Sequence, residues 1–268
     1  MQMKNKVLII TGASSGIGQA LALEGLRQGA RVVMAARNHE AMEEMTRDLD
    51  PASYLIVPAD VSKEADCRRI IDETVEKFGG IDILINNAGI SMRALLKDVK
   101  LDVLDRLMRV NFWGSVYCTK YALPWLLASK GSVIGVSSIA GYKGLPARSG
   151  YSASKFALQG FLETLRVEHL YQDLHVMIAC PGFTGSNIRK TALDKDGNLQ
   201  GESPREETRM MSAETVAKKI LQATAKRKRA LILTRQGRLT VWLNKLFPAW
   251  VDKLVYKHMA KEPDSPLT

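Results

Sequence analysis

The strongest constraint on the fold is an alternation between short, continuously apolar runs and longer segments whose apolar residues recur at helical spacing. Seven strand-like runs occur, at residues 7–11, 31–36, 53–57, 81–86, 132–137, 175–180 and 230–234. Helical patterns separate most of them, which is typical of right-handed crossovers between parallel strands. Uninterrupted apolar strands such as ILIN suit a sheet that is covered on both sides. The pattern predicts an α/β fold with a doubly wound parallel sheet and helices on both faces.

Composition favours one domain. The chain has 268 residues, of which 46% are hydrophobic, and shows no long compositional break, so it can bury a sizeable core. We place the main domain at residues 1–235 and a C-terminal extension at 236–268. No apolar stretch approaches the length of a membrane span, and MQMKNK leads into the first strand without a signal-peptide pattern. We expect a cytoplasmic protein.

The cysteines and histidines show neither a disulfide framework nor metal-ligand spacing. The three cysteines, Cys67, Cys118 and Cys180, lie far apart, and the four histidines form no ligand cluster. We expect reduced packing cysteines and no metal site.

A glycine-rich turn joins the first apolar run to an amphipathic helix that Gly29 closes. Gly12, Gly16 and Gly18 form G-x-x-x-G-x-G, in which the missing side chains permit a tight bend. Such a turn lets the backbone approach a pyrophosphate at the helix N-terminus. The spacing differs from the usual G-x-G-x-x-G, and glycine turns also occur without a ligand. The strand before it and the helix after it favour a nucleotide site.

Tyr151 and Lys155 lie four residues apart at the start of the helical pattern YSASKFALQGFLETLRVEHL, so both side chains should share one helix face. An ammonium about 5 Å from a phenol stabilises phenolate by roughly 3 kcal/mol at an effective dielectric near 20, or about two pKa units. We therefore predict a tyrosine whose pKa is lowered enough to exchange a proton with an alcohol or carbonyl. The spacing alone also occurs on solvated helix faces.

Taken together, these motifs resemble the classical short-chain dehydrogenase/reductase family. The matching pieces follow one another in the family's order over about residues 5 to 235: TGASSGIG (11–18), Asp60, NNAG (86–89), Asn111, Ser138, YSASK (151–155) and PG (181–182). The resemblance extends to the branch with hydroxysteroid and lipid-ketone reductases. It implies a single-domain Rossmann-like fold, a nicotinamide cofactor, and a homodimer or homotetramer formed through the helices that carry Asn111 and Tyr151.

The resemblance also implies a catalytic tetrad of Asn111, Ser138, Tyr151 and Lys155. Tyr151 would give its proton to the substrate oxygen in reduction and take one in oxidation, while Lys155 would lower its pKa and bond the nicotinamide ribose. Ser138 would hold the substrate oxygen, with neighbouring Ser137 as the alternative. Asn111 follows the helical stretch LDRLMRV, which suggests a local helix irregularity, and would hold a water that links the lysine to solvent.

The end of the second apolar run, RVVMAARN, is where a dinucleotide enzyme reads the adenosine ribose. An acid there would favour NAD, but this chain has Ala36 and then Arg37, whose guanidinium can bind a 2′-phosphate. We expect NADP(H) in preference to NAD(H), although Ser15 stands where many NADP-using relatives carry a second base. The resemblance implies that the cofactor contacts are Gly12, Ser14, Ser15, Gly16, Ile17, Gly18, Arg37, Asp60, Val61, Asn87, Ala88, Gly89, Tyr151, Lys155, Pro181, Gly182 and Ser186.

Residues 181–211 lose periodicity and gain Gly, Ser, Pro and charge, which makes the segment too long for a simple connection. Because it follows the strand that leads from the catalytic region, we predict a substrate lid. The alternative is a surface insertion without function.

The net charge of +10 is concentrated near the C-terminus, where residues 226–261 hold ten Lys or Arg and one acid. Within this stretch we predict two amphipathic helices, of which Pro248 opens the second. Their apolar stripe would pack on the protein or a second subunit, rest on a membrane surface, or border a substrate entrance. The KRKR run at 226–229 lacks interleaved aromatics, so we expect no nucleic-acid partner.

These observations predict an NADP(H)-dependent oxidoreductase that interconverts a ketone and a secondary alcohol on a lipophilic substrate, such as a sphingoid or steroid-like lipid. Three alternatives remain: an NAD(H)-dependent dehydrogenase of a small polar alcohol, aldehyde or sugar; an epimerase or dehydratase; and a non-catalytic nucleotide-binding scaffold with a basic docking tail.

Overall fold

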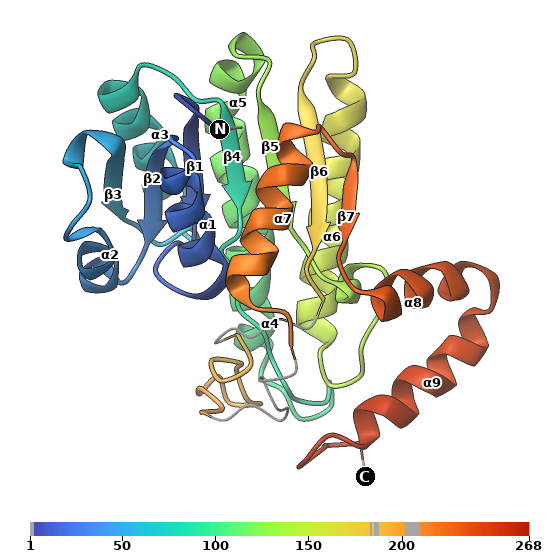
Figure 1. The fold of residues 1–268 in the computed structure, drawn as a ribbon. Coiled ribbons are helices and arrows are strands. Elements are labelled where there is room, and N and C mark those ends of the chain that lie inside the picture. Colours follow the sequence, from blue (N-terminus) through green and yellow to red (C-terminus); the bar gives the residue numbers. More distant parts are fainter. Residues whose placement is uncertain (1–2, 183, 185–187, 202–209, 268) are drawn as a thin grey trace.

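A seven-stranded parallel sheet with helices on both faces forms the body of the protein (Figure 1). The computed structural model describes residues 3–182, 184, 188–201 and 210–267. The strand order is β3-β2-β1-β4-β5-β6-β7. The strands are β1 (Val7–Thr11), β2 (Arg31–Ala36), β3 (Tyr54–Pro58), β4 (Ile83–Asn86), β5 (Ser132–Val136), β6 (His175–Cys180) and β7 (Ala230–Ile232). The predicted Rossmann-like α/β fold, doubly wound around one sheet, is confirmed.

Helices cover the sheet in two layers. The helices are α1 (Gly16–Arg27), α2 (His39–Thr46), α3 (Glu64–Phe78), α4 (Leu101–Met108), α5 (Gly114–Ala128), α6 (Ser149–Glu168), α7 (Ala213–Ala225), α8 (Arg235–Leu246) and α9 (Pro248–Ala260). Two short 3-10 turns, η1 (Pro51–Ser53) and η3 (Ile139–Gly141), and one π-helical turn, η2 (Arg109–Trp113), complete the described elements. Helices α1 and α7 lie on one face, whereas α3, α5 and α6 lie on the other (Figure 1).

Each strand contributes to two cores because successive strand side chains point to opposite faces. In β1, Leu8 and Ile10 belong to the core beneath α1 and α7, whereas Ile9 belongs to the core beneath α3, α5 and α6. All three side chains are fully buried. The continuous apolar runs of the sequence therefore reflect a sheet that is covered twice.

Several strands begin or end one or two residues from the sequence-based expectation. Ser53 lies in η1, where the Asp50 carboxylate accepts a hydrogen bond from the Ala52 N–H, so β3 starts after it. At the other end of the chain Thr234 caps α8 by accepting from the Gly237 N–H, which limits β7 to three residues. In both places a side-chain cap starts a helical turn, and a residue that the apolar pattern assigned to a strand belongs to that turn or to its cap.

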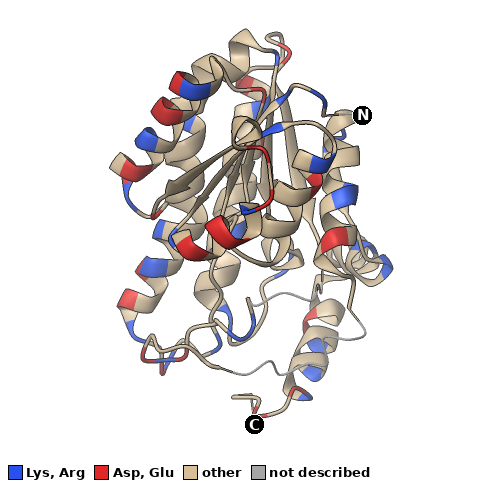
Figure 2. Ribbon diagram, turned by 60° about the vertical axis from the view of Figure 1, so that its left-hand side comes forward, with Lys and Arg blue, Asp and Glu red and all other residues tan. Residues whose placement is uncertain are grey.

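The C-terminal extension forms the two predicted helices, with Pro248 as the first residue of α9. They lie beside the carboxyl end of β7 and lean away from the sheet (Figure 1), and Lys and Arg recur along them (Figure 2). Val251 and Met259 are buried, whereas Trp242, Phe247 and Trp250 are more than half exposed. The predicted stripe is therefore split between a face that packs on the body and a face that meets solvent. No helix in the described part of the chain has the length and apolar character to cross a membrane.

Candidate active site

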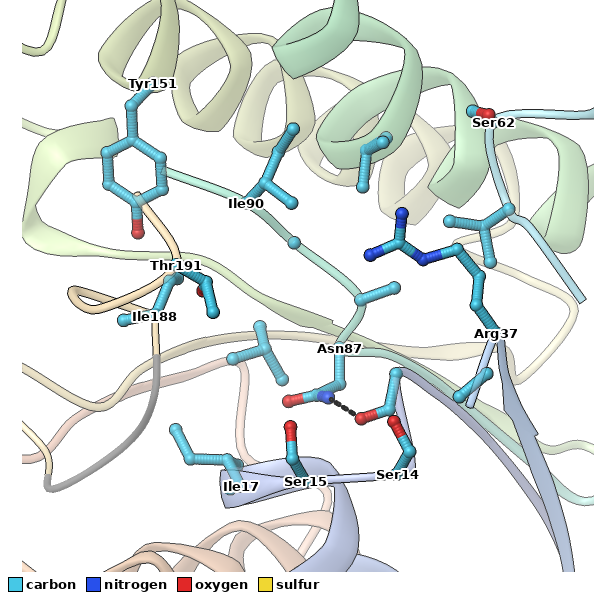
Figure 3. Close-up of a pocket in the computed structure, with 18 of the residues that line it drawn as sticks. Ser14, Ser15, Ile17, Arg37, Ser62, Asn87, Ile90, Tyr151, Ile188 and Thr191 are labelled. Carbon is cyan, nitrogen blue, oxygen red and sulfur yellow. Dashed lines mark hydrogen bonds between the residues drawn. The ribbon is translucent and has the colours of Figure 1, made fainter. Parts of the chain in front are cut away.

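A cavity of about 1130 Å³ opens at the carboxyl ends of the strands, where the strand order reverses between β1 and β4 (Figure 3). Ligands of doubly wound sheets bind in this crevice. The cavity brings together sixteen of the candidate residues from the sequence: Gly12, Ser14, Ser15, Gly16, Ile17, Arg37, Asp60, Val61, Asn87, Ala88, Gly89, Ser138, Tyr151, Lys155, Pro181 and Gly182. Gly18 and Asn111 lie behind its wall, and Ser186 lies outside the described residues.

The glycine turn fits a pyrophosphate. Gly12 and Gly16 have positive φ angles of 67° and 55°, which glycine adopts without strain. A Cβ at Gly18 would lie 2.1 Å from the Gly12 carbonyl oxygen, so Gly18 serves the close packing of helix on turn. No side chain caps the N-terminus of α1, and Ser15, Gly16 and Ile17 line the cavity there. This helix end offers free N–H groups and a positive dipole to an anion.

Asn87 ties the turn after β4 to the glycine turn. Its side-chain amide donates to the Thr11 carbonyl oxygen at 2.9 Å, and the Thr11 hydroxyl accepts from the N–H groups of Asn87 and Ala88 at 3.1 and 3.0 Å. These bonds hold both turns at one edge of the cavity. Asn87 therefore has two roles in the wall of the pocket: it lines the cavity, and it fixes the backbone of the glycine turn.

Arg37 lies on the opposite side of the pocket from Tyr151 in Figure 3. It follows β2, beside Asp60, which follows β3. Burial alone would raise the pKa of Asp60, but hydrogen bonds from Ser62 and the charge of Arg37 hold it below its usual value. Asp60 is therefore ionised at neutral pH. This end of the cavity thus contains a cation at position 37 and no acid at position 36.

Three candidate catalytic groups meet on the β5 and α6 side of the cavity. The Tyr151 hydroxyl points into the pocket (Figure 3), and a hydrogen bond with the Ser138 side chain helps to stabilise its phenolate form. The Lys155 Nζ atom lies 5.8 Å from the centre of the Tyr151 ring. Ser137, the alternative to Ser138, has a buried hydroxyl that accepts from the Gln159 amide at 2.9 Å. The geometry thus favours Ser138 over Ser137 as the partner of the phenol.

The expectation that Lys155 lowers the pKa of Tyr151 is wrong for this arrangement. Burial raises the pKa of Tyr151, although the Ser138 hydrogen bond and the charges of Arg148 and Arg189 act in the opposite direction. Burial also lowers the pKa of Lys155 to about 8, and its ammonium donates to the Val136 carbonyl oxygen at 2.9 Å. Sequence spacing placed the two groups together, but it carried no information on desolvation, which opposes both charged forms.

Asn111 is completely buried within the π-helical turn η2, which confirms the predicted helix irregularity. Its side chain donates to the Ile90 carbonyl oxygen and the Ser154 hydroxyl, both at 2.9 Å, and accepts from the Ile90 N–H at 2.8 Å. A Cβ at Gly89 would lie 3.3 Å from Asn111 Oδ1 and 3.4 Å from Lys155 Nζ. Asn111 and Lys155 therefore flank the same glycine, where a side chain would be tightly confined.

The described part of the predicted lid forms a packed wall of the cavity. Leu193 is buried, its N–H donates to the Ser91 carbonyl oxygen at 2.9 Å, and its own carbonyl oxygen accepts from the Arg93 N–H at 2.8 Å. Residues 188–201 contribute Ile188, Thr191, Leu193 and Leu199 to the lining. The role of this segment as a lid stays a prediction.

Sequence reasoning missed Thr184, whose buried side chain lines the cavity and whose hydroxyl has no hydrogen-bond partner among the described residues. The signal in the sequence was the Thr184 hydroxyl itself, three residues after Pro181 and two before Ser186. The family motif points instead to Ser186, which lies outside the described residues. A buried hydroxyl without a partner in a ligand cavity has an unmet hydrogen bond to offer.

Comparison with known proteins agrees with this geometry. Residues 6–197 match the family described as short chain dehydrogenase. The 11-beta-hydroxysteroid dehydrogenase A of Sesamum indicum is 36% identical over 274 residues, which cover 97% of this chain and 78% of that protein. Dehydrogenase/reductase SDR family member 7B of Rattus norvegicus is 34% identical over 273 residues, covering 98% and 84%. A solved short chain dehydrogenase/reductase SDR from Burkholderia phymatum in complex with NAD matches with a TM-score of 0.81 at 24% identity, covering 93% of this chain and 96% of that one.

The chain therefore belongs to the short-chain dehydrogenase family, in its hydroxysteroid dehydrogenase-like branch. It is an NAD(P)-dependent oxidoreductase that acts on CH–OH and C=O groups. This finding sets aside the non-catalytic scaffold that the sequence alone left open.

Proposed function

We propose that the protein is an NADP(H)-dependent reductase that interconverts a lipophilic ketone and its secondary alcohol, with Tyr151 as general acid and base. The observation that carries the proposal is one cavity with Arg37 at one end and Ser138, Tyr151 and Lys155 at the other. A cation for a ribose phosphate and a proton donor for a carbonyl are what such a reaction needs. The NAD-dependent alternative for a small polar alcohol lacks an acid at position 36 to support it.

The chemistry divides between cofactor and protein. A bound nicotinamide supplies or accepts the hydride. In reduction, Ser138 holds the substrate oxygen by donating a hydrogen bond, and Tyr151 gives that oxygen its proton. The Ser138 hydrogen bond supports the phenolate that remains. Lys155, held by the Val136 carbonyl oxygen beside the phenol, is placed to donate to the ribose of a bound nicotinamide nucleotide. Asn111 fixes the backbone of Ile90 and so holds this wall of the cavity in place beside Lys155.

A lipophilic substrate is supported by the apolar side chains that border the Tyr151 end of the cavity. Ile90 and Leu193 line the cavity and belong to the apolar cluster that includes Tyr151. Ile188 lies near Tyr151 in Figure 3, and Leu199 is bridged to Leu193. Each buried methylene of a substrate contributes about 0.8 kcal/mol. The steroid-related names of the relatives point in the same direction.

We expect kcat/KM for methyl ketones to rise about fourfold for each added methylene from four carbons to about ten, since about 0.8 kcal/mol corresponds to that factor. The measurement is NADPH consumption with a ketone series of graded chain length, with cyclic and steroid ketones as further arms. A short, hydroxylated ketone such as dihydroxyacetone serves as the polar control. Preference for the control, or turnover that is independent of chain length, would show that the substrate is small and polar.

We further propose that the exposed face of α8 and α9 rests on an anionic membrane surface. Trp242, Leu246, Phe247 and Trp250 are each more than half exposed there, and the surrounding stretch is strongly basic. Aromatic residues beside lysines suit the boundary between lipid headgroups and acyl chains. This contact would place a lipid-dissolved ketone near the enzyme.

Co-sedimentation with vesicles checks this contact. Binding to vesicles that contain phosphatidylserine is expected to exceed binding to phosphatidylcholine vesicles and to fall with added salt. Leu246→Ser should weaken binding about tenfold because one apolar side chain leaves the interface. Leu101→Ser removes a leucine on α4 that is more exposed than Leu246, and it should leave binding unchanged. Equal loss in both variants, or no binding by the wild type, would contradict the proposal.

A homodimer or homotetramer is the assembly we propose. Trp113, Trp125 and Phe156, on η2, α5 and α6, are each more than a third exposed, which is unusual for large aromatic side chains on a monomer. Trp113 also stacks on Tyr117 and contacts Phe112, which forms a rigid aromatic patch. Light scattering of the purified protein gives the number of subunits.

A further inference from the structure

We infer that Glu262, at the far end of the C-terminal extension, is a positioning residue for Tyr151: by joining Arg148 and Arg93, it fixes the start of the helix that carries the phenol. The inference rests on the proposed role of Tyr151 and adds a residue more than a hundred positions away in the sequence.

The extension folds back and contacts the connection between Ser138 and Tyr151 at three points. The Asn244 amide donates to the Tyr142 carbonyl oxygen at 3.2 Å, and Lys143 forms an ion pair with Asp252. Beyond α9, the Glu262 carboxylate accepts from Arg148 at 3.0 Å and lies 3.9 Å from Arg93 Nε. The contacts run along the connecting segment in sequence order, so the extension holds it over its whole length.

The Glu262 contact is buried, unlike an ordinary surface ion pair. The side chains of Glu262, Arg93 and Arg148 are 5%, 6% and 13% exposed. The Arg93 side chain also donates to the Pro263 carbonyl oxygen, so both backbone and carboxylate of the tail are engaged. Two guanidinium groups share one carboxylate here, and removal of that carboxylate would take the anion out of a buried ion pair.

Helix α6 needs such support because of how it begins. Tyr151 lies in its first turn, where N–H groups have no partner inside the helix. The preceding residue, Arg148, provides no side-chain cap, and the first turn contains no acid. Ala147 just before it has a positive φ of 58°, which a non-glycine residue adopts only when its surroundings enforce it. The Glu262 carboxylate holds Arg148, the residue that immediately precedes this helix, and so fixes the backbone at the helix start.

Through Arg93 and Arg148, Glu262 contacts two backbone segments that are also hydrogen-bonded to each other. The Ala94 N–H donates to the Ala147 carbonyl oxygen at 3.0 Å, next to Arg93 and Arg148. Arg93 itself follows Met92, which packs in the apolar cluster that includes Tyr151. Glu262 therefore holds α6, the helix that carries Tyr151, against the segment that contains Arg93. It acts from outside the cavity, because Glu262 is not among the lining residues.

The test compares Glu262→Gln with Asp264→Asn, which removes the same charge from an exposed position two residues along the tail. Hydrogen exchange by mass spectrometry should be about tenfold faster in a peptide that covers residues 149–155 of Glu262→Gln, and unchanged in Asp264→Asn. A peptide from α3 serves as the internal reference and should keep its wild-type rate in both variants. Glu262→Asp keeps the charge on a shorter side chain and should recover part of the protection.

Kinetics give the second readout. In Glu262→Gln, kcat with the best ketone of the series should fall about tenfold, because the phenol is misplaced. The Kd for NADPH should stay within twofold of wild type, because the glycine turn and Arg37 are not involved. Exchange at 149–155 that matches the wild type, an equal acceleration in α3, or an unchanged kcat would each overturn the inference. Failure of the wild type to reduce any ketone would refute the proposed function, whereas the exchange result would still decide the role of Glu262.

Discussion

Replacement of Tyr151 by phenylalanine is expected to lower kcat for ketone reduction by about 10² to 10⁴, the range that a general acid contributes. The change removes one oxygen atom and leaves the ring in its apolar cluster, so the fold should persist. The Kd for NADPH should change little, because the groups at the Arg37 end of the cavity are untouched. Initial rates of NADPH oxidation and fluorescence titration of NADPH measure the two quantities.

The matched control is Tyr142→Phe. Tyr142 belongs to the same connecting segment and is half buried, with burial raising its pKa to about 12, but its side chain does not line the cavity. This control should keep kcat within about twofold of wild type. A Tyr151→Phe enzyme with more than a tenth of wild-type turnover would mean that another group donates the proton.

The second large effect concerns cofactor choice. Arg37→Ala is expected to raise the Kd for NADPH about 10- to 100-fold, since a hydrogen bond to a charged group is worth about 1.5–3 kcal/mol. The Kd for NADH should change less than threefold, because NADH has no 2′-phosphate. Addition of Ala36→Asp places a carboxylate where it accepts ribose hydroxyls and repels the phosphate, which should reverse the preference.

Lys63→Ala provides the control for Arg37. Lys63 is a neighbouring exposed cation that, like Arg37, lowers the pKa of Asp60, but it does not line the cavity. Its removal should leave the ratio of the two dissociation constants within about twofold. Equal losses for NADPH and NADH in Arg37→Ala would indicate that Arg37 contributes only a general field or a structural contact.

Local patterns predicted much of this molecule because each was set by neighbours in the sequence. The buried strands follow from their continuous apolar runs, and the start of α9 follows from Pro248. The helix irregularity at Asn111 was predicted from its place in an apolar helix, although the π-helical form of the turn was not. In each case the residues that decide the outcome lie within a few positions of one another.

The features that escaped the sequence depend on contacts between distant residues. The pKa of Lys155 falls because of burial and not because of the tyrosine four residues away. Glu262 and Arg148 are in contact although 114 positions separate them in the sequence, so no local pattern predicts the contact. Ser186, which the family motif singled out, lies outside the described residues, whereas Thr184 offers the buried hydroxyl.

The most direct test of the account follows the hydride itself. The wild-type enzyme is incubated with a twelve-carbon methyl ketone and NADPH that carries deuterium at the transferable position of its nicotinamide ring, and the products are analysed by mass spectrometry. The account predicts a secondary alcohol with one deuterium at the carbinol carbon from the wild type, and almost none from Tyr151→Phe. If the wild type binds NADPH but forms no labelled alcohol from any ketone of the series, the proposed reaction is wrong.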